Sequence, residues 1–190
     1  IGVAREFRLA LALFQQAERA PANEAGALYE RAAHDMEAAV NSNRNHPQAA
    51  LATYYVALAY ERTGRFDTAT QTYQRITRDF NNTQDTAGRE LTGEALTQRV
   101  NILEVSNFRA AVNLERIFDF DSSIRYYNNV VSDNRFANAA DHASHVHDSL
   151  ASIALINTNL GRWDAARAAW IAFAPRAEAG RERAEAEFRA

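Results

Sequence analysis

Apolar residues recur every three or four positions along most of this chain. That spacing places them on one face of an α-helix. It runs through residues 3–19, about 23–40, 47–63, 67–79, 91–117, 121–132, about 139–160 and 164–173. No segment shows the strict alternation of apolar and polar residues that is typical of a half-buried β-strand. The pattern therefore predicts an all-α protein, with loops at the stretches rich in asparagine, proline and glycine.

The stretch Tyr60–Tyr73 predicts a helical hairpin with a very short turn. One apolar stripe ends at Gly64, and a second begins after Phe66. Glycine readily adopts the left-handed conformation that closes a helix. Asp67 is predicted to cap the next helix, because its carboxylate can accept hydrogen bonds from free backbone N–H groups.

The same signature recurs at Ile117–Tyr127 and Leu160–Trp170. In each copy an aromatic-Asp pair is followed by a small residue, a second aromatic and an apolar residue at constant spacing. The pairs are Phe66-Asp67, Phe120-Asp121 and Trp163-Asp164, the small residues Ala69, Ser123 and Ala166, the second aromatics Tyr73, Tyr127 and Trp170, and the apolar residues Ile76, Val130 and Phe173. Recurrence of one helical hairpin indicates a helical repeat array.

These residues resemble the tetratricopeptide repeat, a helical hairpin of about 34 residues. The resemblance is closest over residues 50–83, nearly as close over 147–180, and degenerate over 104–137. In the degenerate copy Phe118 occupies the turn position where glycine is usual. The resemblance implies an α-solenoid with about three recognisable repeats, preceded by N-terminal helices and followed by a C-terminal capping helix.

The spacing of the copies departs from a regular array. The first aromatics are separated by 54 and then 43 residues, so longer helices or an inserted turn must absorb the excess. We expect one solenoid over residues 1–190, in a chain that is a piece of a longer protein because it begins without methionine. Its predicted parts are an N-terminal hairpin (1–46), a repeat (47–83), a degenerate repeat with a long helix (86–133), a repeat (138–174) and a terminal helix (176–190).

The composition argues against several classes of function. The net charge is −3, which gives no electrostatic footprint for nucleic acid, and the chain has no cysteine for disulfides or thiolate-bound zinc. No apolar run approaches the roughly 18 residues of a membrane span. Phosphate-binding glycine loops and the motifs of metalloproteases and serine hydrolases are absent. We therefore expect neither an enzyme nor a bound cofactor.

In tetratricopeptide arrays the first helix of each hairpin forms the inner, concave surface. The resemblance implies a protein-binding groove there, apolar and aromatic with an arginine rim, that suits an amphipathic helix or an extended apolar peptide. Its predicted residues are Tyr54, Tyr55, Leu58, Arg62, Phe108, Arg109, Val112, Arg116 and Leu155. The Lys and Asn pattern that clamps a peptide carboxylate in some members is absent. Alternatively, the N-terminal helix with Phe7, Leu11 and Phe14 fills the groove, and the protein is a structural spacer.

A histidine-rich segment offers a second function class. Residues 141–148 read D-H-A-S-H-V-H-D, and on a helix Asp141, His145 and Asp148 would share one face. A metal- or small-ligand-binding helical domain built around His142, His145 and His147 is therefore the alternative to a scaffold. The competing interpretation is a polar helix start with Asp141 as the N-cap.

The leading hypothesis is a non-catalytic protein–protein interaction scaffold in a bacterial envelope complex for assembly, trafficking or motility. Elongated repeats of this kind resemble those of bacterial envelope proteins. All 21 basic residues are arginine, which is consistent with a GC-rich bacterial genome. We expect a periplasmic or envelope-associated protein that assembles into a larger complex, with a cytoplasmic location as the alternative.

Overall fold

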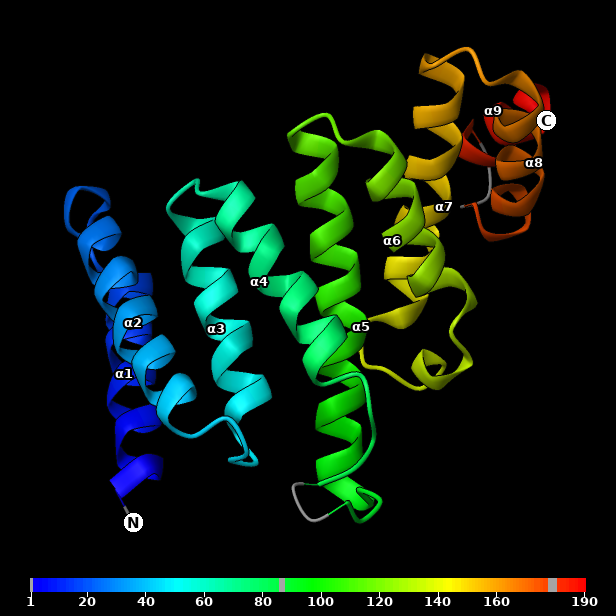
Figure 1. Ribbon diagram of the computed structural model, residues 1–190. Helices are drawn as coiled ribbons and strands as arrows, with labels where there is room; N and C mark the ends of the chain where they lie inside the picture. Colours follow the sequence, from blue (N-terminus) through cyan, green and yellow to red (C-terminus); the bar gives the residue numbers. More distant parts are fainter. Residues whose placement is uncertain (1, 86–87, 178–180) are drawn as a thin grey trace.

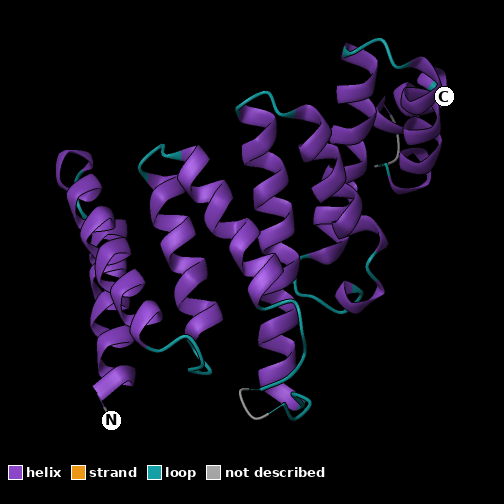
Figure 2. Ribbon diagram, viewed as in Figure 1, coloured by secondary structure: helices purple, strands orange, loops and turns teal. Residues whose placement is uncertain are grey.

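The computed structural model describes residues 2–85, 88–177 and 181–190, and these residues form helices joined by turns and loops (Figures 1 and 2). The helices are α1 (Gly2–Arg19), α2 (Ala22–Ser42), α3 (Ala49–Arg62), α4 (Phe66–Asp79), α5 (Gly93–Arg116), α6 (Phe120–Ser132), η1 (Asn134–Phe136), α7 (His142–Asn159), α8 (Trp163–Phe173), η2 (Ala174–Arg176) and α9 (Arg181–Arg189). Within the described ranges the only β-pairing is an isolated bridge between Gln84 and Glu90. The predicted all-α class is confirmed.

Successive helices form hairpins that stand side by side in chain order (Figure 1). Each helix packs mainly on its neighbours in sequence, and α1, α3, α5 and α7 also contact one another in succession. The first helices of the hairpins therefore line one side of the solenoid, and the second helices line the other. None of the described helices is long and apolar enough to cross a membrane.

The N-terminal helix extends the row of hairpins and covers one end of the predicted groove. α1 packs on α2 and α3. Phe14 makes edge-to-face contacts with Tyr29 and Tyr55, with ring centroids 5.2 and 5.1 Å apart. Leu11 packs against the same cluster. α1 therefore covers Tyr55 and Leu58 of the predicted groove, as the self-filling alternative requires, but it does not fill the whole groove.

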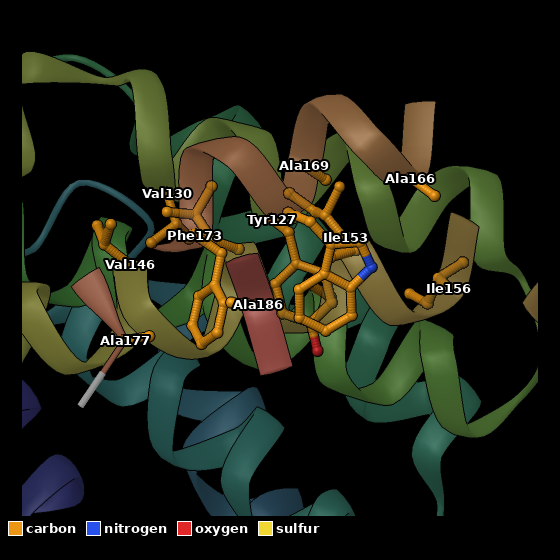
Figure 3. Close-up of a cluster of buried hydrophobic side chains, with 14 residues drawn as sticks. Tyr127, Val130, Val146, Ile153, Ile156, Ala166, Ala169, Phe173, Ala177 and Ala186 are labelled. Carbon is orange, nitrogen blue, oxygen red and sulfur yellow. The ribbon is translucent and has the colours of Figure 1, made fainter. Parts of the chain in front are cut away.

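The small residue of each repeat lies where the two helices of a hairpin meet. Ala69, Ser123 and Ala166 are all buried. The Ser123 hydroxyl also donates a 2.9 Å hydrogen bond to the Ala111 carbonyl of the facing helix. At the C-terminal end, Figure 3 shows side chains from α6, α7, α8 and α9 converging in one cluster. Close helix contact thus requires a small side chain at this position.

A hydrogen bond recurs inside each of the three matching hairpins. The second aromatic donates to a polar side chain twelve residues earlier, in the last turn of the preceding helix. The bonds are Tyr73 to Glu61 (3.0 Å), Tyr127 to Glu115 (2.9 Å) and Trp170 Nε1 to Thr158 (3.1 Å). Burial raises the pKa of Tyr73 and of Tyr127, so both hydroxyls remain protonated donors.

The turn between the helices is also the same in all three hairpins. Gly64, Phe118 and Gly161 have φ values of 76°, 63° and 68°, as the turn predictions require. The next N–H then bonds back to the preceding helix over 2.9 Å in each copy. Phe118 adopts this left-handed conformation despite its Cβ, and its side chain is 78% exposed.

The capping prediction for Asp67 is wrong. α4 begins at Phe66, and Arg65 is the N-cap residue without a side-chain cap bond. After the left-handed Gly64 the helix begins at once, and the Arg65 carbonyl accepts its first hydrogen bond, from the Ala69 N–H at 2.9 Å. Asp67 therefore lies in the first turn, where its charge is favourable to the helix dipole. Among the second helices of the three matching hairpins, all of them described, only α6 has a side-chain cap, with Asp119 accepting from the Ser122 N–H at 3.2 Å.

Phe118→Gly is expected to stabilise the protein by about 1 kcal/mol, because glycine carries no penalty in the left-handed region. Urea unfolding followed by circular dichroism measures the change. Gly64→Ala is the matched reversal: a Cβ there meets nothing within 4 Å, so only backbone strain remains. It should destabilise by a similar amount. Destabilisation by Phe118→Gly would mean that the exposed ring contributes more than the strain costs.

Candidate functional site

The candidate site begins with the unusual length of α5. This helix has 24 residues, whereas α3 has 14. When the two are aligned at Gly64 and Phe118, the surplus forms about three extra turns at the start of α5. Figure 1 shows these turns reaching beyond the end of α3. The irregular repeat spacing is therefore absorbed partly by helix extension on the inner side of the solenoid.

The extension forms one wall of an open hollow of about 450 Å³ on the inner side, between α3, α5 and the start of α7. Its lining residues are Leu51, Tyr54, Glu94, Thr97, Gln98, Asn101, Ile102, Glu104, Val105, Ala139, Ala140, Asp141 and His145. We call this cavity the inner hollow. Leu51, Tyr54 and Val105 are only partly buried, so they give it an apolar floor that a ligand could cover.

The charged side chains that line the inner hollow are mainly acidic. Glu94, Glu104 and Asp141 line it, and no arginine does. Glu104 is 2% exposed, and its two carboxylate oxygens lie 3.0 and 2.8 Å from His145 Nδ1. The His145 ring also stacks on Phe108 at 4.1 Å between centroids. Glu104 and His145 are therefore a packed pair joining α5 to α7, which leaves Glu94 and Asp141 as the hollow's exposed charges.

The predicted site residues of α3 are divided between different environments. Tyr54 lines the inner hollow. Tyr55 lines a smaller pocket of about 50 Å³ against Phe7 and Leu11 of α1. Leu58 is only 7% exposed and belongs to the cluster formed with α1 and α2, so it serves as core. Arg62 is exposed.

The remaining apolar predictions do not line the inner hollow. Phe108 and Val112 pack against the C-terminal core cluster. Leu155 on α7 is 44% exposed. The extra wall was not predicted from the sequence; it is formed by Glu94, Thr97, Gln98 and Asn101. The long apolar period of residues 91–117 was the available signal for them.

The arginine rim differs from the prediction at Arg109 and Arg116, because both side chains contact other residues of the protein. Arg109 Nη1 donates to Glu61 at 2.9 Å, and Asn113 Nδ2 donates to the same carboxylate at 3.3 Å. Arg116 bonds Asn113 at 3.2 Å, and its guanidinium lies 5.0 Å from the ring centre of Phe66. Glu61 thus connects α3 to α5, in addition to accepting the bond from its own hairpin.

The predicted histidine constellation does not converge. His142 and His145 approach Glu104, whereas His147 lies 3.0 Å from Asp148 and 3.4 Å from Glu182 of α9. Asp141 precedes α7 without a side-chain cap bond. Among the residues whose placement is described, no group of three or more His, Asp or Glu side chains could hold a metal ion. The metal-binding alternative based on Asp141, His145 and Asp148 is therefore not supported by the geometry.

The fold and its recurring contacts define a solenoid of helical hairpins, and one comparison with known families agrees. Residues 51–83 match the family model described as Tetratricopeptide repeat. The matched segment contains the clearest hairpin, α3 and α4, and this hairpin is a tetratricopeptide repeat. No significant match was found among the curated proteins.

Glu61→Ala should cost about 2–3 kcal/mol in unfolding free energy, because it leaves the Arg109 charge without its carboxylate. The expected loss of unfolding free energy is smaller than for a fully buried ion pair, because the Arg109 side chain is 32% exposed. Glu115→Ala is the matched control at the same repeat position, and it should cost only about 1 kcal/mol for the lost Tyr127 bond. Equal losses in the two variants, measured by urea unfolding, would contradict a role for Glu61 between hairpins.

His147 should make the stability of the C-terminal end depend on pH. Hydrogen bonding to Asp148, followed by Glu182, raises the pKa of His147 above its ordinary 6.5. Its stabilising contribution is therefore complete below the unfolded-state pKa and is lost as pH rises through the folded-state pKa. His147→Gln should lower the unfolding free energy more at about pH 6 than at about pH 8.5. A cost that is equal at both pH values would rule out this linkage.

Proposed function

We propose that this chain is a non-catalytic scaffold that binds a segment of another protein in the inner hollow. The observation that carries the proposal is an open cavity with an apolar floor on the side lined by first helices, with no part of the described chain filling it. Partly buried Leu51, Tyr54 and Val105 can lose further contact with water when a segment covers them. The tetratricopeptide repeat supports a protein partner, because helical repeat solenoids present extended concave binding surfaces.

The bound segment is an amphipathic helix or an extended apolar peptide. The hollow adjoins a small apolar pocket, because Leu51 lines both. A segment that runs across α3 can therefore place apolar side chains in two adjacent depressions, as peptide-binding grooves commonly require.

The wider context that we propose is a bacterial envelope complex, with the protein in the periplasm or associated with the envelope. The elongated repeats support this placement by their resemblance to envelope proteins. The absence of cysteine is consistent with an oxidising compartment. Fractionation of the source cells tests the location, and recovery of the protein only from the cytoplasm would contradict it.

Leu51→Gln should weaken binding of a hollow-directed segment about fivefold to tenfold, because it replaces apolar contact area with a polar amide. Segments are first selected from a displayed peptide library against the purified wild-type protein. Their affinities are then measured by calorimetry for the wild type and the variant. Selected segments that bind both proteins equally well would show that the hollow is not the binding site.

The matched control is Ile171→Gln. Ile171 lies on α8 and is 57% exposed, so the same change in polarity occurs outside the inner hollow. This control should leave the affinity of the selected segments unchanged. Circular dichroism of both variants establishes that any loss of binding does not come from unfolding.

A further inference from the structure

Two unpaired carboxylates flank the inner hollow. Glu94 lies in the first turn of α5, and Asp141 immediately precedes α7. Both side chains line the hollow and both residues are exposed. Across the described parts of the chain, neither carboxylate makes an ion pair or a hydrogen bond. Each is favourable at a helix start, but its charge toward the hollow is not compensated by the protein.

Glu104, the third acidic residue of the hollow, differs from Glu94 and Asp141 because histidines lie beside its carboxylate. Glu104 is buried, and His145 lies within 2.8 Å of it while His142 lies within 3.5 Å. The hollow contains no arginine that could offset Glu94 or Asp141. An acidic partner would therefore meet only repulsion at this rim, whereas a basic side chain would meet two unpaired charges.

The apolar floor of the same hollow suits the stem of a long basic side chain. Leu51 and Val105 offer aliphatic contact, and Tyr54 offers an aromatic ring. Arginine and lysine bury their methylene stems on apolar surface while the charged group stays at the water-exposed end. A guanidinium can in addition lie over an aromatic face.

We propose that the inner hollow recognises an arginine or lysine of the partner segment, with its stem on Leu51 and Val105 and its charge between Glu94 and Asp141. An apolar residue of the same segment then enters the adjoining pocket lined by Leu11 and Tyr55. This inference rests on the proposed function and adds the chemistry of the partner: an apolar segment with a basic anchor.

The test uses three fluorescein-labelled peptides of about 12 residues, with leucine and alanine at the same positions in all three. The other positions are arginine in the first peptide, glutamine in the second and glutamate in the third. Fluorescence anisotropy measures their affinity for the whole chain. The arginine peptide should bind about tenfold more tightly than the glutamine peptide at low salt, and the glutamate peptide should bind most weakly. Raising the salt concentration should reduce the difference.

The decisive variant combines Glu94→Gln and Asp141→Asn, which removes both charges and nearly preserves side-chain size. It should weaken binding of the arginine peptide about tenfold and leave the glutamine peptide unaffected. The matched control combines Glu24→Gln and Glu30→Gln, which removes two exposed charges from α2 and gives the same net charge. The control should bind the arginine peptide as the wild type does.

The proposal would be overturned by no binding of the arginine peptide, by equal binding of the arginine and glutamate peptides, or by an equal loss in the control variant. The last result would mean attraction by net charge alone. The proposed scaffold function is judged separately, by the library-selected segments and Leu51→Gln. If those segments need Leu51 but ignore Glu94 and Asp141, the scaffold function stands and the basic anchor is wrong.

Discussion

The bond from the second aromatic of a hairpin to the last turn of its first helix fixes the relative position of the two helices. In the clearest repeat this bond runs from Tyr73 to Glu61, and Glu61 also receives Arg109 from the next hairpin. One partly buried carboxylate therefore sets both the geometry within a hairpin and the geometry between hairpins. Because a hydrogen bond is directional, it fixes the register of the two helices, whereas the surrounding apolar contacts have no preferred direction.

This register determines which surface is available for binding. With α3, α5 and α7 on one side, residues added at the start of α5 must project beyond α3 and form a wall there. The inner hollow thus results from the extra length of α5, which departs from the regular repeat, while the contacts within each hairpin keep to it. Other residues of the inner side are used in contacts within the protein: Leu58 is core, and Arg109 is paired. The binding function that we propose is concentrated where the repeat is irregular.

Local sequence signals predicted the fold well because they act over a few residues. Gly64 marked a left-handed turn, and Ala69 marked a close helix contact, since each depends on the size of one side chain. The role of Arg109 could not be predicted in the same way, because its partner lies 48 residues earlier and depends on how α3 and α5 pack. Likewise, Glu94 and Asp141 meet at one cavity only after three helices have assembled.

Amide hydrogen exchange, measured by mass spectrometry with and without a bound segment, tests the central claim that the irregular part of the inner side binds the partner. The account predicts slower exchange at the start of α5, over residues 93–105, and at residues 139–145, with little change in α2, α4 and α8. Protection confined to those outer helices, with residues 93–105 unchanged, would contradict it.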